Sequence, residues 1–223
     1  MPPDYVEQVR KWHDRAYAEA LEEGAVERAF DYLGHLIVVP PEVMPVTPMS
    51  HLLGEAVLAE VRPGDTVLDM GTGSGVNAVL AASRGARVLA VDVSQPALDA
   101  ARLNALRNGV AERVEVRRSD VFSDVDSRFD LIVFDPPFRW FKPRSLTEVA
   151  MADEGYRALT RFFREAREHL TDEGRMLIFF GTSGDVGYLE QLMGQHGFTW
   201  ESIAHDDLVR DGWKVDYFTF RVE

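Results

Sequence analysis

One glycine-rich turn between a strand and a helix constrains the fold of this chain more than any other feature. Asp69–Gly75 has the sequence DMGTGSG, with glycines at 71, 73 and 75. The segment Thr66–Asp69 before it predicts a strand, and 75–84 predicts a helix. Glycine permits positive φ and close approach to the backbone, and a helix N-terminus presents free N–H groups. The turn therefore predicts a ligand-binding strand–turn–helix unit.

Strands and helices alternate along the chain after Pro63. Strands are expected at 66–69, 87–92, 114–116, 129–134 and 176–180, and later helices at 94–109, 153–170 and 188–196. This alternation is typical of a parallel sheet covered by helices on both faces. Two more strands, near 198–204 and 214–221, are expected to pair antiparallel at the end. The predicted fold class is α/β, Rossmann-like, with a mostly parallel sheet and a C-terminal antiparallel strand pair.

The first 35 residues have a different pattern. Between residues 4 and 31, apolar residues recur at helical spacing, from Val6 to Ala20, which predicts one or two helices ending near Gly34. The chain is therefore divided into an N-terminal helical extension, 1–35, and an α/β domain, 36–223. Several prolines make the following segment extended, and Ser50 is a candidate cap for a helix over 51–61.

Composition limits the classes of site and partner. The 223 residues contain no cysteine, which excludes disulfides, thiolate zinc sites and cysteine-held iron–sulfur clusters. The six histidines form no i, i+4 pair, so no metal site is expected. The formal net charge of −13 repels a phosphate backbone, which makes RNA a disfavoured partner relative to a protein or a small molecule. No apolar run approaches the ~20 residues that span a bilayer, and no signal peptide is evident, so a cytoplasmic protein without a membrane partner is expected.

Acidic residues follow three successive predicted strands. A carboxylate at Asp69 would repel a pyrophosphate but pair with an ammonium group, and S-adenosylmethionine (SAM) carries an ammonium and a sulfonium whereas NAD carries neither. The spacing G-x-G-x-G also differs from the G-x-G-x-x-G of dehydrogenases. Asp92 follows Asp69 by 23 positions, close to the ~20 expected of a residue that holds ribose hydroxyls. Asp120 follows the third strand and is placed to accept from the adenine amino group.

Each acidic residue also has a structural interpretation: Asp92 alone suits a helix cap, and Asp120 alone suits a turn. Together, at the edge where open α/β sheets bind ligands, they predict a SAM site. The residues assigned to it are Asp69, Gly71, Thr72, Gly73, Gly75, Asp92, Val93, Ser119, Asp120, Val121 and Asp135.

Asp135-Pro136-Pro137-Phe138 follows the fourth strand on the same edge and is the predicted catalytic segment. Two prolines remove backbone donors and stiffen the chain, which leaves carbonyls and the Asp135 side chain free to accept. With Phe138 as an aromatic platform, this array suits a planar group that bears N–H, and it would aim the nitrogen lone pair at the SAM methyl group. The alternative is a rigid turn with a core phenylalanine.

A basic loop, 139–144, comes next. Arg139 and Trp140 are expected to contact an acidic or stacked substrate. The alternative, a solvated loop with buried aromatic residues, stays open.

These segments resemble the class I SAM-dependent methyltransferases, and within them the branch with [Asn/Asp]-Pro-Pro-[Tyr/Phe]. That branch includes release-factor glutamine, rRNA guanine-N2 and adenine-N6 methyltransferases, and the resemblance covers about residues 36–223. Pro48 and Ser50 match the segment that precedes the SAM site in the glutamine branch, which implies contact with the substrate. The departures are Asp135 where the glutamine enzymes have Asn, His51 where they have Glu, and a shorter N-terminal segment.

The resemblance implies methyl transfer from SAM, with S-adenosylhomocysteine (SAH) as product, to the planar nitrogen of a protein glutamine or a base. A release-factor-like protein or a small molecule is the expected partner. The alternatives are a biosynthetic methyltransferase for a nitrogen, oxygen or carbon of a small molecule, and a non-catalytic SAM-binding scaffold. An NAD-dependent oxidoreductase is a more distant possibility.

Overall fold

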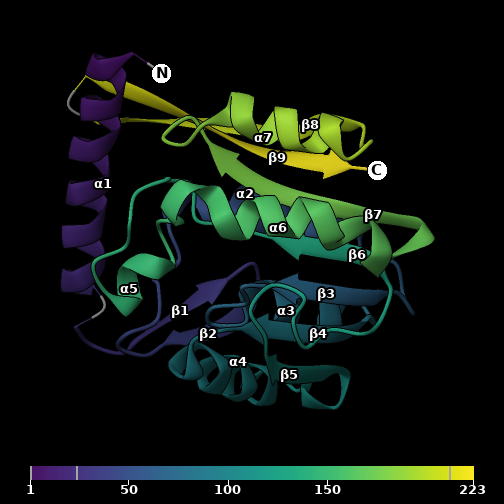
Figure 1. Ribbon diagram of the computed structural model, residues 1–223. Coiled ribbons are helices and arrows are strands. Elements are labelled where there is room, and N and C mark those ends of the chain that lie inside the picture. Colours follow the sequence, from purple (N-terminus) through teal and green to yellow (C-terminus); the bar gives the residue numbers. More distant parts are fainter. Residues whose placement is uncertain (1, 24, 211) are drawn as a thin grey trace.

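A seven-stranded sheet forms the centre of the computed structural model, which describes residues 2–23, 25–210 and 212–223 (Figure 1). Its strand order is β5-β4-β3-β6-β7-β9-β8. The strands are β3 (Thr66–Met70), β4 (Arg87–Asp92), β5 (Val114–Arg118), β6 (Phe129–Phe134), β7 (Leu170–Gly181), β8 (Trp200–Arg210) and β9 (Trp213–Val222). Neighbours from β5 to β7 pair parallel, and β9 pairs antiparallel with β7 and β8. The predicted sheet, including its antiparallel end, is confirmed.

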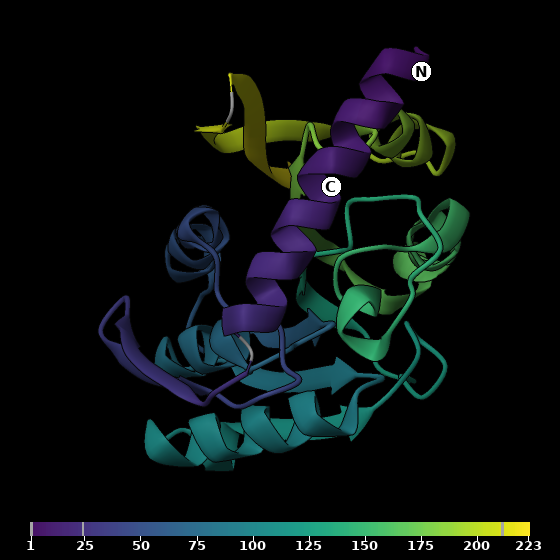
Figure 2. The same ribbon diagram turned by 90° about the vertical axis from the view of Figure 1, so that its left-hand side faces the viewer.

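Helices cover both faces of the sheet (Figure 2). They are α2 (His51–Glu60), α3 (Val76–Ser83), α4 (Gln95–Arg107), α5 (Leu146–Val149), α6 (Arg157–Ala166) and α7 (Val186–Gln195), with 3₁₀ turns at Pro48–Ser50, Ala111–Arg113, Glu154–Tyr156 and Arg167–His169. Helices α2, α3 and α4 lie toward one face, and α6 and α7 lie on the other. Because both faces are covered, the middle of β6 is fully buried, which explains its continuous apolar sequence.

The N-terminal segment contains a helix and a hairpin. Helix α1 (Pro3–Glu23) ends earlier than expected, and β1 (Arg28–Tyr32) pairs antiparallel with β2 (His35–Val39). The helical prediction for the last part of 4–31 is therefore wrong. Leu33 and Gly34 have φ of +50° and +83°, which forms the kind of two-residue turn that joins hairpin strands. Two predicted caps also differ, because neither Ser50 nor Ser94 accepts a capping hydrogen bond through its side chain.

Helix α1 crosses the carboxyl edge of the parallel strands, as Figures 1 and 2 show together. In the middle of the helix Trp12 packs edge-on against Trp213, with ring centroids 5.1 Å apart. The next residue, His13, has its Nε2 2.6 Å from Glu148 Oε1, and both side chains are buried. The helix therefore joins the β8–β9 hairpin to the long connection after β6, above the edge where the site is predicted. In the described part of the chain, no helix is long and apolar enough to cross a membrane.

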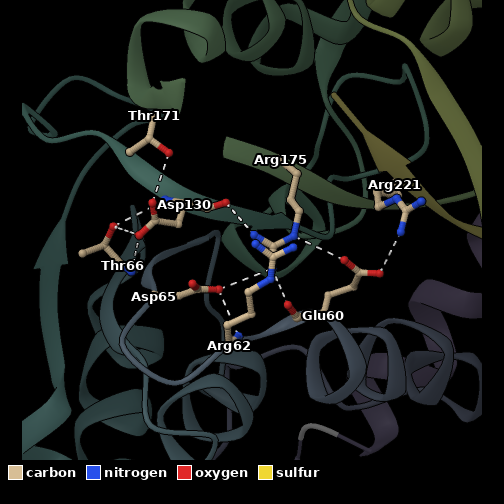
Figure 3. Close-up of polar contacts among 8 residues, drawn as sticks. All are labelled: Glu60, Arg62, Asp65, Thr66, Asp130, Thr171, Arg175 and Arg221. Carbon is tan, nitrogen blue, oxygen red and sulfur yellow. Dashed lines mark hydrogen bonds and ion pairs between the residues drawn. The ribbon is translucent and has the colours of Figure 1, made fainter. Parts of the chain in front are cut away.

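The opposite edge of the sheet is closed by a buried polar network (Figure 3). Arg175 donates to Glu60 Oε2 at 3.2 Å, to Asp65 Oδ2 at 3.3 Å and to the Asp130 carbonyl at 2.9 Å. Asp130 in turn accepts from the backbone and the hydroxyl of Thr66, both at 2.8 Å. Arg175, Glu60 and Asp65 all have charged partners, so removing one of them would leave an uncompensated charge at the amino ends of the strands.

Candidate functional site

The turn after β3 is held closely on one side and is open on the other. Gly75 has φ of +81°, and a Cβ there would lie 2.7 Å from the Cα of Ala101 in α4, so only glycine fits. Thr72 N donates to the Val91 carbonyl at 2.9 Å, which fixes the turn to β4. Gly73 also has positive φ, +55°, but a Cβ there would meet no atom within 4 Å. Gly73 is half-buried, with open space on its Cα where a ligand can approach closely.

Asp69 is buried at the end of β3, with 2% of its surface exposed. Its Oδ2 accepts from the Thr72 hydroxyl at 2.5 Å and from Ala78 N at 3.0 Å. Burial raises the pKa of Asp69 to about 6, the two hydrogen bonds lower it, and Asp92 adds to the rise. Both bonds end on one oxygen, so among the described residues Oδ1 has no hydrogen bond and can accept from an ammonium group.

Asp92, which was predicted to hold ribose hydroxyls, ends β4 and organises the glycine-rich turn. Its Oδ2 accepts from Gly73 N at 3.0 Å and its Oδ1 from Ser94 N at 2.9 Å. Burial raises the pKa of Asp92, and these backbone bonds oppose the rise. The cap-like role is therefore present, and the carboxylate keeps further lone pairs for a ligand. Val93 beside it is 41% exposed and offers an apolar surface.

The segment after β5 combines a rigid turn with an exposed acid. Ser119 is buried, and its hydroxyl donates to the Val121 carbonyl at 2.7 Å. Val121 has φ of +54°, a strained conformation for a β-branched residue, of the kind that is common at binding sites. Asp120 is exposed and forms an ion pair with Arg161 of α6. Asp69, Asp92 and Asp120 thus follow three adjacent strands, as predicted, whereas ligand contacts for these residues stay a prediction.

Asp135 follows β6 and is the least constrained acid of the site. Its side chain is exposed, and no hydrogen bond or ion pair to it occurs within the described ranges. Desolvation by the surrounding protein is the main cause that raises the pKa of Asp135. The Asp69 carboxylate raises it further, and Arg139 lowers it. Because water still reaches the carboxylate, the exposed surface limits this rise. Asp135 is therefore a free, exposed acceptor at the carboxyl edge of the sheet, close to Asp69.

Phe138 packs in the hydrophobic core. It is 7% exposed, and its ring lies 5.1 Å from that of Phe180 and 5.5 Å from that of Phe179. Its carbonyl accepts from the Tyr156 hydroxyl at 2.6 Å, so that acceptor is already used. Pro136 is buried and Pro137 is half-buried. This packing agrees with the rigid-turn alternative, and the aromatic-platform role of Phe138 stays a prediction.

The basic loop is only partly buried: Arg139 and Phe141 are buried, whereas Lys142 and Arg144 are exposed. Arg139 is only 7% exposed, its guanidinium lies 5.5 Å from the ring centre of Phe138, and its Nε is buried without a hydrogen-bond partner. Burial is the main cause that lowers the pKa of Arg139. Trp140 is half-buried and packs on the rings of Phe141 and Tyr156. The loop thus brings one enclosed positive charge close to Asp135.

Pro48 and Ser50 form a local turn. The Ser50 hydroxyl accepts from Thr47 N at 3.0 Å, and the Pro48 carbonyl lies 2.6 Å from His51 Nδ1. These bonds shape the entry to α2. Contact of Pro48 or Ser50 with a substrate stays a prediction.

Two tyrosines near Asp135 were missed by the sequence analysis. The Tyr32 hydroxyl is buried without a partner, and Tyr32 fits only because position 54 is glycine, where a Cβ would lie 2.6 Å from that hydroxyl. Burial first, and then the Asp135 and Glu55 carboxylates, raise the pKa of Tyr32. The pKa of Tyr217 in β9 is likewise raised, mainly by burial, with Asp135 contributing. Neither tyrosine belongs to a motif, so only the fold identifies it.

Comparisons with known proteins agree with this geometry. Residues 46–200 match the family model described as "Methyltransferase small domain". The chain is 33% identical over 172 residues to the ribosomal protein uL3 glutamine methyltransferase of Bradyrhizobium diazoefficiens, covering 70% of this chain and 54% of that protein. It is 36% identical over 168 residues to the release factor glutamine methyltransferase of Cereibacter sphaeroides, covering 68% and 59%. The chain thus spans little more than half the length of these curated relatives.

A solved structure supports the fold independently. The ribosomal protein L11 methylase of Lactobacillus delbrueckii subsp. bulgaricus superposes with a TM-score of 0.60 at 24% identity, covering 82% of each chain. The resemblance drawn from Asp69–Gly75 and Asp135–Phe138 is therefore confirmed at the level of family and fold.

Proposed function

The chain belongs to the methyltransferase small domain family, and from this premise we propose that it transfers a methyl group from SAM to a planar nitrogen. The observation that carries the proposal is the Asp135 carboxylate. It lies beside Asp69 at the carboxyl edge of the sheet, exposed and without a partner among the residues described. A rigid, unused acceptor next to a cofactor turn suits an acceptor group that must present N–H.

The residues of the turn fit SAM. Asp69 Oδ1 is free to accept from the ammonium group, and open space beside Gly73 leaves room for the ligand. Asp92 keeps lone pairs for ribose hydroxyls, and the exposed Val93 provides an apolar surface for the adenine. SAM supplies an electrophilic methyl group on a sulfonium, and SAH is the product. The family membership supports SAM as the cofactor.

Asp135 would act mainly by positioning. Its carboxylate accepts from an N–H of the acceptor and turns the nitrogen lone pair toward the methyl group, so that displacement occurs in line. The stiff Pro136-Pro137 pair keeps the carboxylate in place. The nitrogen loses one proton during or after transfer, and Asp135, whose pKa is raised, is an acceptor for that proton.

A protein glutamine is the first substrate class, because the two sequence relatives described above are both named as glutamine methyltransferases. A small molecule is the second, because α1 crosses the carboxyl edge and Arg139 is 7% exposed, which limits access to the deepest part of the site. RNA is disfavoured by the net charge of −13.

The test is transfer of labelled methyl from SAM to a fractionated lysate, followed by identification of the methylated atom. We expect label on nitrogen, in the protein or small-molecule fraction. Asp135→Ala should lower turnover by about 100-fold or more and leave SAM affinity nearly unchanged, whereas Asp135→Asn, which keeps an acceptor oxygen, should retain part of the turnover. Label on carbon or oxygen, no SAM binding in calorimetry, or full turnover of Asp135→Ala would contradict the proposal.

A further inference from the structure

The described residues include two buried arginines, one with charged partners and one without. Arg175 is 5% exposed and Arg139 is 7% exposed. Arg175 forms ion pairs with Glu60 and Asp65 and donates to two backbone carbonyls. Arg139 forms no side-chain hydrogen bond or ion pair in the described ranges, and its Nε is buried without a partner. Carboxylates of the fold therefore neutralise the buried charge of Arg175 but not that of Arg139.

An unpaired buried guanidinium is costly to keep. Removing a cation from water without a compensating partner destabilises a fold, and the ring of Phe138 under Arg139 offsets only a small part of that cost. Asp135 is close enough to affect the pKa of Arg139, yet it forms no ion pair with it. The charge is thus held beside the candidate catalytic carboxylate with its donors unused.

We propose that Arg139 is the receptor for a carboxylate carried by the methyl acceptor, an inference that rests on the proposed function. The guanidinium presents paired N–H donors in a plane that match the two oxygens of a carboxylate or a phosphate. A carboxylate fits better, because Asp69, Asp92 and Asp135 all lie at this edge and repel a dianion more strongly than a monoanion.

The carboxylate that Arg139 binds can come from two sources. A free small molecule can carry the carboxylate, or an acidic residue can lie beside a methylated glutamine in a protein. In both cases Asp135 holds the nitrogen and Arg139 holds the carboxylate, so the acceptor is fixed at two points. Two-point binding would select acceptors by the spacing of the two groups.

The first part of the test separates a binding role from a structural one. Arg139→Met, Arg175→Met and the exposed loop control Lys142→Met are compared with the unchanged chain for melting temperature and SAM affinity. We expect Arg139→Met to melt at the same temperature or higher, because it removes an unpaired buried charge, and Arg175→Met to melt lower. SAM affinity should be unchanged in Arg139→Met. A drop in melting temperature like that of Arg175→Met, or a loss of SAM affinity, would overturn the proposal.

The second part measures carboxylate binding to the chain saturated with SAH. The probes are acetate, L-glutamine, L-glutaminamide, inorganic phosphate and a pair of short peptides with blocked termini that carry glutamate or glutamine beside a central glutamine. We expect L-glutamine or the glutamate peptide to bind at least about tenfold more tightly than its counterpart that lacks this carboxylate, and Arg139→Met, but not Lys142→Met, to abolish the difference. The probe that shows the preference identifies the source of the carboxylate.

The proposal fails if no carboxylate probe binds, if phosphate binds more tightly than every carboxylate, or if Arg139→Met keeps the preference. Methyl transfer and SAM binding are measured on the same preparation. If SAM binds and label reaches nitrogen while Arg139→Met makes no difference, only the carboxylate inference fails. If SAM does not bind, the proposed function fails as well.

Discussion

Alanine at Gly75 and alanine at Gly73 should separate the folding role of the turn from its binding role. Both glycines have positive φ, +81° and +55°, so both substitutions strain the backbone. Only at Gly75 would the new Cβ meet backbone, 2.7 Å from Ala101 Cα and 3.4 Å from its carbonyl oxygen. Ala101 lies in the middle of α4, so it cannot move without shifting that helix away from the turn.

The magnitudes follow from these two terms. A left-handed conformation costs an alanine about 1–2 kcal/mol, and forcing a methyl group into packed structure costs about 1–3 kcal/mol more. Gly75→Ala should therefore destabilise the fold by about 2–5 kcal/mol and lower the melting temperature by about 4–20 °C, whereas Gly73→Ala should cost about 1–2 kcal/mol. Gly73→Ala instead places its methyl group in the open space assigned to SAM and should weaken SAM binding at least about tenfold.

Thermal melting and calorimetry with SAM, on both variants and the unchanged chain, measure the two effects. Stability is compared without ligand, because bound SAM would raise the melting temperature of any variant that retains affinity. The reasoning is refuted if Gly75→Ala is as stable as Gly73→Ala. It is also refuted if Gly73→Ala binds SAM as tightly as the unchanged chain.

Three further predictions concern charges. Arg175→Met leaves Glu60 with Arg221 and Asp65 with Arg62 N, so it should cost about 3 kcal/mol in denaturant unfolding, the low end for a broken buried pair. Burial raises the pKa of Asp69 from 3.8 to about 6, so protonation competes with SAM: affinity should fall about tenfold per pH unit below pH 6 and reach a plateau above it, and Asp69→Asn should flatten that profile in calorimetry. Burial alone would raise the pKa of Glu148, but hydrogen bonds from Arg144 and His13 lower it from 4.5 to about 2. The stabilisation that the Glu148 carboxylate gives the fold is therefore present above pH 4.5 and lost as the pH falls through 2. Glu148→Gln should weaken the docking of α1 at neutral pH, which faster hydrogen exchange in α1 would measure.

The sheet could be predicted from the sequence because its signals are local. The apolar run of β6 and the glycines after β3 each fix a structure within a few residues. The β1–β2 hairpin could not be predicted, because Leu33-Gly34 lacks the Asn-Gly or Asp-Gly pair that marks such turns. In addition, Phe30 and Tyr32 become buried only by packing against the α/β domain. Tyr32 was therefore assigned to a helix, and its unpartnered hydroxyl near Asp135 was missed.

The position of the candidate residues on the fold was predictable from the sequence, but their burial was not. Asp69, Asp92 and Asp135 were expected to lie at one edge because each comes at the end of a strand, and parallel strands end at one edge. The environment of Arg139 and Phe138 depends on rings from β7 and β9, which lie about 40 residues or more farther along the chain. A basic loop after Pro-Pro gives no local sign that one of its charges is enclosed.

Arginine and aspartate side chains are paired at one edge of the sheet and unpaired at the other. At the amino edge, Arg175 and its carboxylates neutralise one another, and the result is a closed, stabilising network. At the carboxyl edge, Asp135 and Arg139 are near each other but unpaired, and Asp69 keeps one oxygen free. Pairing those groups would stabilise the fold and consume the donors and acceptors that a ligand needs. Because the unpaired Asp135 and Arg139 side chains and the free oxygen of Asp69 all lie at the edge crossed by α1, we infer that their partners are supplied by the cofactor and the methyl acceptor.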